Sequence, residues 1–201
     1  TSPDIVSITA GALTKKDYEC EVDDAGYLTG ESLYPRLIFD LDAVSGGTGI
    51  YERIEFRTVA SNTLVAQKTV EAGENIYTYT LPNYLTAATS YYAEVFDTNG
   101  CSASTTVETI SPTLIMSSLI ANQTQTKTCV QNEVLSITVS TTTVYSNEPI
   151  EYSIIKVGWP GTVGSPVILN SLTWSATIAD PGNYIIKAKN MVTNCEITAN
   201  Y

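Results

Sequence analysis

Arg53-Ile54-Glu55-Phe56-Arg57 alternates charged and apolar side chains, residue by residue. Successive side chains of a β-strand point to opposite faces, so this stretch predicts a strand with one face in a core and one in water. The residues on either side fall into similar short segments rich in Val, Ile, Thr and Tyr, without a sustained 3.6-residue period. The chain is therefore expected to be all-β, with no helix longer than a turn.

Short apolar segments separated by Gly, Pro and Asn-Gly continue to the end of the chain. In the first half they predict strands near 5–8, 17–22, 37–44, 50–59, 64–70, 76–81, 91–97 and 104–110. In the second half they predict strands near 114–120, 135–139, 150–157, 167–169, 172–178, 184–188 and 195–199. About seven short strands per half are typical of an immunoglobulin-like β-sandwich.

The two halves end alike, which favours a tandem repeat. Tyr91–Cys101 and Tyr184–Cys195 each run from a Tyr-initiated strand through a turn to a cysteine. Single cores usually serve about 100 to 150 residues, so 201 residues suit two domains. We place the boundary at the proline after Ser111 and predict an acidic immunoglobulin-like sandwich at 1–111 and a second sandwich at 112–201.

Charge excludes some partners. The net charge is −11, and residues 1–111 hold 16 of the 21 acidic residues, so the chain would repel the phosphates of nucleic acid. No run of about 18 uncharged apolar residues occurs, so we expect no membrane insertion by this segment.

Four cysteines stand at Cys20, Cys101, Cys129 and Cys195, with no C-x-x-C pair and no His to complete a zinc site. Three pairings are possible. We expect Cys20–Cys101 and Cys129–Cys195, because each bond then stays inside one sandwich. Such bonds imply an oxidising, extracytoplasmic location. Four buried free thiols are the alternative.

The absence of His also removes the Ser-His-Asp and Cys-His catalytic arrangements, and nothing singles out a pair of carboxylates. We therefore expect no enzymatic activity and no cofactor other than a possible Ca²⁺. Oxygen-rich acidic stretches can bind Ca²⁺, and the candidate ligands are Asp23, Asp24, Asp40, Asp42 and Asp97. Solvated acidic faces explain these residues as well, and an Asx-turn closing a hairpin explains Asp97.

Aromatic side chains are the candidates for ligand contacts, since exposed Tyr and Trp stack on sugars and anchor protein contacts. The candidates are Tyr77, Tyr79, Tyr84 and Trp159, the last in a Trp-Pro-Gly loop. Tyr77 and Tyr79 share one face of a strand, so core or cross-strand packing is the alternative for them. Trp174 alternates with Leu172 and Ala176 and is expected in the core. Tyr91 or Tyr92, and Tyr184, are candidates for a tyrosine corner, whose hydroxyl bonds to the backbone a few residues upstream.

Val95-Phe96-Asp97-Thr98-Asn99-Gly100-Cys101-Ser102-Ala103-Ser104, followed by Ile110-Ser111-Pro112, resembles the end of an SprB-type repeat from the giant adhesins of Bacteroidota. Ser45-Gly46-Gly47-Thr48-Gly49-Ile50-Tyr51 is similar to the Gly-Gly stretch in the middle of such repeats. The second half keeps Pro181-Gly182-Asn183-Tyr184 and Cys195, but has no Gly-Gly and reads Thr-Asn-Cys.

The resemblance implies a stalk or adhesive array on the bacterial cell surface, exported by type IX secretion and in some members used in gliding motility. Its partners would be neighbouring repeats of the same chain and a surface glycan or protein receptor. The competing hypothesis is a carbohydrate- or protein-binding module assisted by Ca²⁺.

Overall fold

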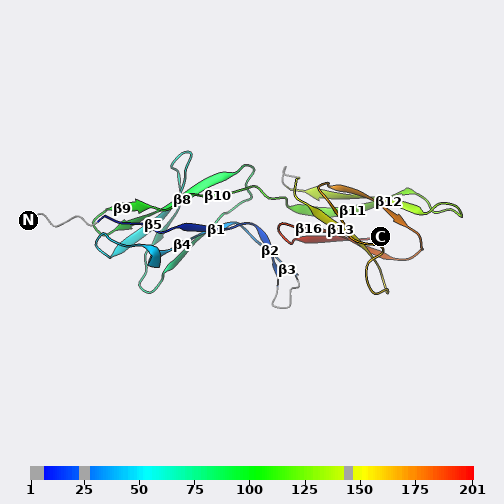
Figure 1. The fold of residues 1–201 in the computed structure, drawn as a ribbon, viewed down its shortest axis with the longest axis horizontal. Helices are drawn as coiled ribbons and strands as arrows, with labels where there is room; N and C mark the ends of the chain where they lie inside the picture. The colour runs from blue at the N-terminus through cyan, green and yellow to red at the C-terminus, as the bar shows by residue number, and fades with distance from the viewer. Residues whose placement is uncertain (1–6, 23–27, 143–146) are drawn as a thin grey trace, which may run out of the picture. The chain divides into compact units, whose positions relative to one another are not determined.

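The fold was derived from a computed structural model, which describes residues 7–22, 28–142 and 147–201, with the backbone alone for residues 22 and 28–32. Its contacts divide the chain into two compact units (Figure 1). Unit 1 consists of Thr1–Tyr18 and Tyr34–Pro112, and unit 2 of Glu19–Leu33 and Thr113–Tyr201. The predicted boundary after residue 111 lies next to the place where the chain passes from unit 1 to unit 2 for the second time, at Pro112. Glu19–Leu33, which the prediction put in the first domain, belongs to unit 2 by its contacts.

Unit 1 is built from two antiparallel sheets. The first has the order β1-β4-β7, with β1 at Leu13–Lys16, β4 at Arg36–Asp40 and β7 at Ile76–Thr80. The second has the order β10-β8-β5-β6, with β9 also paired to β8. Its strands are β5 Tyr51–Thr58, β6 Leu64–Thr69, β8 Thr89–Asp97, β9 Ser102–Ser104 and β10 Glu108–Ile110.

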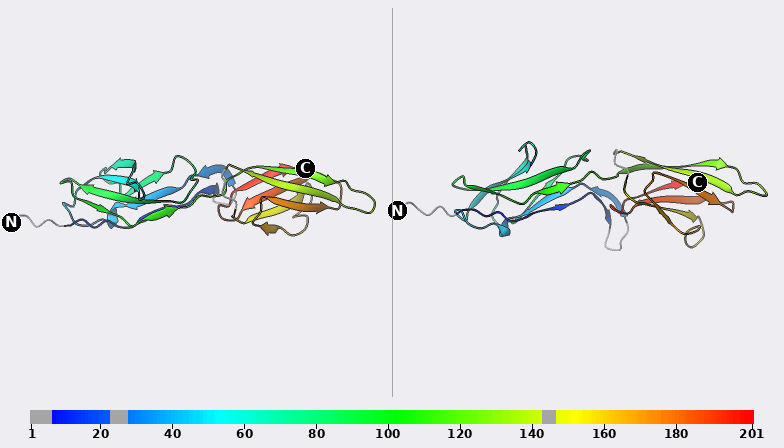
Figure 2. Two further views of the ribbon diagram at one scale, coloured as in Figure 1. Left: turned by 90° about the horizontal axis from the view of Figure 1, so that it is seen from above. Right: turned by 45° about the horizontal axis from the view of Figure 1, so that its top comes forward.

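Unit 2 repeats this plan. Its first sheet has the order β11-β12-β15, with β11 at Met116–Gln125, β12 at Glu133–Thr141 and β15 at Thr173–Ile178. Its second sheet has the order β14-β13-β16-β17, with strands Val167–Leu169, Ile150–Lys156, Tyr184–Asn190 and Glu196–Asn200 in that order. β11 and β12 form a long hairpin (Figure 2). The predicted all-β class with two immunoglobulin-like sandwiches is confirmed.

A short separate hairpin belongs to unit 2. It consists of β2 (Glu19–Val22) and β3 (Leu28–Leu33), with Glu19 opposite Leu33 and Cys20 opposite Ser32. In the chain it lies between β1 and β4, where Lys16 is opposite Arg36. Sequence patterning predicted the region of β2 but not β3, because Leu28-Thr29-Gly30-Glu31-Ser32-Leu33 has no strict apolar alternation.

The stretch Arg53–Arg57 behaves as its alternation predicts. Ile54 and Phe56 are fully buried in β5, and they pack with residues of both sheets. The core of unit 1 consists of Leu13, Leu37, Phe39, Ile54, Phe56, Tyr77, Leu81, Tyr91, Ala93, Val95 and Ile110. Since these residues come from both sheets, one shared core holds the sandwich together.

On the other face of β5, Glu55 is enclosed by two arginines. Its carboxylate lies 2.9 Å from Arg53 Nε and 2.6 Å from Arg57 Nη2. Burial alone would raise the pKa of Glu55, but hydrogen bonds and charge from Arg53 and Arg57 outweigh it, so this pKa is lowered. The face of β5 that was predicted to face water therefore carries the ion-paired side chains of Arg53, Glu55 and Arg57, which keep this surface polar.

Gly46 and Gly47 stand where the chain passes close to the first residues that the structure describes. Gly46 has a φ of +87°, and a Cβ there would lie 2.0 Å from the carbonyl oxygen of Ser7. A Cβ on Gly47 would lie 2.7 Å from the Ile8 side chain. The Gly-Gly pair therefore permits a close packing that no larger residue allows.

A few boundaries differ from those expected. The strand predicted at 37–44 ends at Asp40 and gives way to a 3-10 turn at Leu41–Ala43, which Asp40 caps by accepting from the Asp42 N–H. Trp174 is half-buried rather than fully enclosed, and its ring lies 5.5 Å from that of Tyr152. Among the described residues, no helix is long and apolar enough to cross a membrane.

We predict that Phe56→Ala destabilises unit 1 by about 3–5 kcal/mol, because it leaves a cavity at the centre of the shared core. Urea unfolding followed by circular dichroism measures the loss. Val107→Ala is the control, since Val107 is exposed and its truncation should cost less than about 0.5 kcal/mol. Equal effects of the two substitutions would contradict the assigned core.

Candidate functional site

A disulfide joins Cys20 of β2 to Cys195, which follows β16 in the turn before β17. The two Cα atoms lie 5.0 Å apart, and the cysteines are separated by 175 residues in the chain. Beside the bond, the Cys20 N–H donates to the Thr193 carbonyl at 3.2 Å. The hairpin β2–β3 is thus attached to the β16–β17 turn by a covalent bond and a hydrogen bond.

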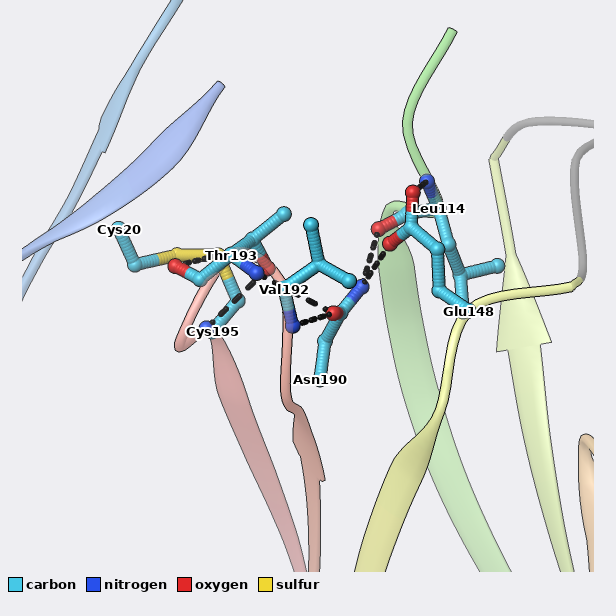
Figure 3. Close-up of a disulfide and its surroundings, with 7 residues drawn as sticks. All are labelled: Cys20, Leu114, Glu148, Asn190, Val192, Thr193 and Cys195. Carbon is cyan, nitrogen blue, oxygen red and sulfur yellow. Dashed lines mark hydrogen bonds between the residues drawn. A yellow bond between two sulfur atoms is a disulfide. The ribbon is translucent and has the colours of Figure 1, made fainter. Parts of the chain in front are cut away.

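Asn190, at the end of β16, holds this turn in shape (Figure 3). Its Oδ1 accepts from the backbone N–H groups of Val192 at 2.8 Å and Thr193 at 3.2 Å. Its Nδ2 donates to the Leu114 carbonyl at 3.1 Å and to the carboxylate of Glu148. The buried amide therefore uses all of its hydrogen-bonding groups, which favours one rigid turn conformation.

Glu148 completes this network from the loop before β13. It is buried, and its Oε1 accepts from the Leu114 N–H at 3.1 Å. Figure 3 shows Leu114, Glu148 and Asn190 converging from three segments, next to the turn that carries Cys195. Sequence reasoning missed Glu148 and Asn190, because an isolated Glu or Asn in a loop or strand end carries no local pattern.

The predicted disulfide partners are corrected. Cys20 bonds to Cys195, whereas Cys101 and Cys129 are free and exposed. The prediction assumed that each bond stays within one sandwich formed by a continuous stretch of chain. That assumption fails because Glu19–Leu33 packs with unit 2, which brings Cys20 to the β16–β17 turn.

Asp97 closes the turn between β8 and β9. Its Oδ1 accepts from the N–H groups of Asn99 at 3.0 Å and Cys101 at 2.9 Å, and its Oδ2 accepts from Thr48 N–H at 3.1 Å. Gly100 has a φ of +81°. The Asx-turn that the sequence suggested at Asp97 is therefore present, and the buried Asp97 carboxylate accepts hydrogen bonds from backbone N–H groups.

The other acidic candidates do not gather into one site. Asp40 caps the short 3-10 turn, and Asp42 accepts from the side-chain amide of Asn75 at 3.0 Å. Asp23 and Asp24 lie outside the described residues. In the part of the chain that the structure describes, no three His, Cys, Asp or Glu side chains are grouped closely enough to hold a metal ion. Calcium binding stays a prediction.

The tyrosine candidates lie in different surroundings. Tyr77 is buried in the core, where its hydroxyl donates to the Glu74 carbonyl at 3.0 Å. Tyr79 is half-buried, with its ring 5.8 Å from that of Phe56. Tyr84 is 37% exposed and packs against Tyr34 at 5.1 Å between ring centroids. A hydrogen bond with the Tyr34 hydroxyl, together with burial, raises the pKa of Tyr84 to about 12.

Trp159 lines a pocket of about 240 Å³ in unit 2, together with residues of the same loop and Lys156, Ala179, Asp180 and Tyr184. Its indole is 66% exposed, and Lys156 Nζ lies 5.5 Å from the ring centroid. The Tyr184 hydroxyl donates to the Asp180 carbonyl, so the tyrosine corner predicted at Tyr184 is confirmed. Tyr184 also forms one wall of the pocket. An exposed indole beside a lysine, in a pocket that Asp180 also lines, is suited to stacking against a polar ring.

No protein-family model and no curated protein matches this chain. Among solved structures, the fibronectin(III)-like modules of CbhA from Clostridium thermocellum align with a TM-score of 0.35 and 16% identity over 82% of this chain and 83% of that chain. A two-domain fibronectin type III segment of chicken tenascin aligns at 0.38 and 10% identity over 96% and 98%. The D00-D0 domain of intimin aligns at 0.30 and 16% identity over 98% and 97%. Likeness at this level does not indicate function.

We predict that Glu148→Ala destabilises the protein by about 1–3 kcal/mol, since it leaves the Leu114 N–H and the Asn190 amide without their acceptor in a buried place. It should also speed reduction of Cys20–Cys195 by dithiothreitol, because the turn loses its support. Chemical unfolding and timed alkylation measure the two effects. Glu151→Ala, at a half-buried position in β13, should change neither; a stable, slowly reduced Glu148→Ala protein would disprove the role of the network.

Proposed function

We propose that this chain is a tension-bearing and adhesive pair of repeats within a long secreted surface protein of the SprB type. The observation that carries the proposal is the Cys20–Cys195 disulfide. When the chain is pulled from its two ends, the force passes along the residues before Cys20, through the disulfide, and along the residues after Cys195. The residues between the two cysteines, which form nearly all of both sandwiches, then carry no tension.

The size of this effect follows from chain length. Of the 201 residues, 19 lie before Cys20 and 6 lie after Cys195. At about 3.5 Å per extended residue, the segments under tension reach about 90 Å, whereas the bypassed loop would add about 600 Å if it unfolded. Closing so long a loop also stabilises the folded state by about 5 kcal/mol in the chain-entropy model. A bond at this position therefore suits a protein that must keep its length under load.

The bond also supports an extracellular location, because disulfides persist in oxidising compartments. The SprB-type resemblance supports the finer parts of the proposal: display on the bacterial surface, export by type IX secretion, a role in attachment and gliding, and neighbouring repeats as partners. We expect no enzymatic activity.

We predict that pulling single oxidised molecules from their ends releases no more than about 90 Å, from the segments outside the bond that include β1 and β17, whereas Cys20→Ser/Cys195→Ser releases steps totalling about 600 Å. The reason is that the bond carries the force in the first case and the folded sheets carry it in the second. Optical tweezers or atomic force microscopy measures the released length.

Cys101→Ser/Cys129→Ser is the matched control, since it removes two cysteines and keeps the bond. It should behave like the parent protein. Equal released length with and without Cys20–Cys195 would overturn the mechanical part of the proposal.

The pocket at Trp159 favours a second candidate function, a carbohydrate- or protein-binding module. Ligand pockets usually hold about 300–1,000 Å³, so one of about 240 Å³ suits a single sugar ring or one side chain rather than a larger molecule. The exposed indole supplies the stacking face, and Lys156 and Asp180 supply polar partners for hydroxyl groups.

We predict that Trp159→Ala lowers the affinity for a glycan at least ten-fold, because it removes the stacking face. Loss of a ring-stacking contact of about 1.4 kcal/mol raises the Kd ten-fold. A glycan array followed by titration calorimetry, with and without Ca²⁺, measures it. Ile168→Ala, an exposed apolar position on β14, is the control. Unchanged affinity in Trp159→Ala, or no glycan bound by the parent protein, would exclude carbohydrate binding at this pocket.

A further inference from the structure

Seven strands of unit 1 correspond to seven strands of unit 2, while, among the described strands, β10 and the hairpin β2–β3 have no counterpart. β1, β4 and β7 occupy the positions of β11, β12 and β15, and β6, β5, β8 and β9 occupy those of β14, β13, β16 and β17. Each unit also begins its second sheet alike: Tyr51 of β5 is opposite Asp97, and Ile150 of β13 is opposite Asn190. A structural feature found in one unit can therefore be compared with the residues at the matching position in the other.

Cys101 and Cys195 stand in matching turns. Both turns are closed by a backbone hydrogen bond from the last strand residue to the cysteine carbonyl, Asp97 to Cys101 at 2.9 Å and Asn190 to Cys195 at 2.8 Å. In both, the side chain of that last residue accepts backbone N–H groups of the turn. The residue before each cysteine has a positive φ, +81° at Gly100 and +59° at Asn194.

Cys20 and Cys129 also match. Cys20 stands 17 residues after a Ser-Pro pair ending at Pro3, and Cys129 stands 17 residues after the Ser-Pro pair ending at Pro112. Each lies four residues beyond the first strand of its unit, β1 ending at Lys16 and β11 ending at Gln125. Both therefore lie in the connection between the first and second strands of a unit.

By chain order, the observed bond thus joins the cysteine in the connection after the first strand of unit 1, its first-connection cysteine, to the turn cysteine of unit 2, although the connection that carries Cys20 itself packs with unit 2. Cys20, from the connection between β1 and β4, bonds to Cys195 in the β16–β17 turn. By this rule, the partner of Cys101 would belong to a unit before residue 1 and the partner of Cys129 to a unit after residue 201. The two cysteines that are free are the two that this rule leaves over.

We propose that Cys101 and Cys129 are the two unfilled halves of this same bond. Cys129 pairs with the turn cysteine of a following unit of the same build, and Cys101 pairs with the first-connection cysteine of a preceding unit. This inference rests on the proposed function, in which the chain is part of a repeat array, and it names the bond between repeats.

The surroundings of Cys129 suit a partner. Its turn is held by Thr128, whose Oγ1 accepts from Gln131 N–H at 3.1 Å, so the thiol is presented on an ordered loop. Val130 beside it is 90% exposed, an apolar side chain with nothing covering it among the described residues. In the observed bond the Cys20 N–H donates to Thr193, two residues before Cys195; the matching acceptor for Cys129 is the carbonyl two residues before a turn cysteine, as Asn99 is before Cys101.

The chemistry needs an oxidant, which we take to be a disulfide of the oxidising compartment. The Cys129 thiolate attacks it to form a mixed disulfide, and the turn-cysteine thiolate then displaces the second sulfur. One S–S bond forms between the units while the oxidant's S–S bond is lost, and two protons and two electrons pass from the cysteine thiols to the oxidant. Oxidised glutathione serves as this oxidant in the test.

The test uses two full-length variants mixed in equal amounts with oxidised and reduced glutathione. Cys101→Ser keeps the free Cys129, and Cys129→Ser, carrying a size tag, keeps the free Cys101. Random pairing gives the mixed dimer only twice as often as either like dimer. We expect the mixed Cys129–Cys101 dimer to exceed each like dimer about twenty-fold, on non-reducing gels and by peptide mapping, which is ten times the random ratio and corresponds to about 1.4 kcal/mol of recognition.

The control is Cys101→Ser/Cys129→Ser/Ser165→Cys, which presents a thiol on another exposed loop of unit 2 and should pair with Cys101 at random. Random ratios for Cys129 as well, or a Cys101–Cys129 bond within single parent molecules, would overturn the inference. Neither outcome touches the pulling experiment on Cys20–Cys195, so failure of this inference and failure of the proposed function can be told apart.

Discussion

The disulfide between Cys20 and Cys195 is the constraint on which the rest of this protein depends. It is made possible by the hairpin Glu19–Leu33, which leaves the sheet order of unit 1 after β1 and packs with unit 2 before the chain returns at β4. One covalent bond therefore closes a loop that contains most of the chain. Without it, the short two-stranded hairpin β2–β3 would be only marginally stable by itself.

The turn that receives this bond is prepared from inside unit 2. Asn190 is the last residue of β16 and is fully buried. Its side-chain amide makes four hydrogen bonds, two to the turn and one each to Leu114 and Glu148. A buried amide that is completely paired has one favourable orientation, since any rotation would leave polar atoms unpaired. The position of Cys195 is thus set by a polar network rather than by apolar packing. In unit 1 the carboxylate of Asp97 does the same work for the turn of Cys101.

If every unit in an array made the proposed bond to the next, the covalent loops would overlap. The loop from Cys20 to Cys195 already contains Cys101 and Cys129, the residues through which the bonds to both neighbours would run. Tension would then pass along disulfides and the short segments between them, and each sandwich would be bypassed. The charge of the segment need not follow this repetition, because the acidic residues are concentrated in residues 1–111 and leave the second half nearly neutral.

Much of the fold could be predicted from local pattern. The alternation in Arg53–Arg57 defined β5 and its buried face, because strand geometry follows from the period of the side chains alone. The Asn-Gly turn, the role of Asp97 in it and the tyrosine corner at Tyr184 are equally local, since each involves residues within five positions of one another. The exposed indole of Trp159 followed from its Pro-Gly loop.

What the sequence by itself determined is the all-β class, two sandwiches, and the oxidisable cysteines that suit an extracellular chain. Only the tertiary structure decided which cysteines meet, because that depends on where the hairpin Glu19–Leu33 packs, a choice made by contacts far apart in the chain. The network of Leu114, Glu148 and Asn190 was likewise decided there, since its members lie up to 76 residues apart and no local pattern links them. The physical reason is the same in both cases: strand periodicity is a property of neighbours, whereas a disulfide and a buried hydrogen-bond network are properties of the packed whole.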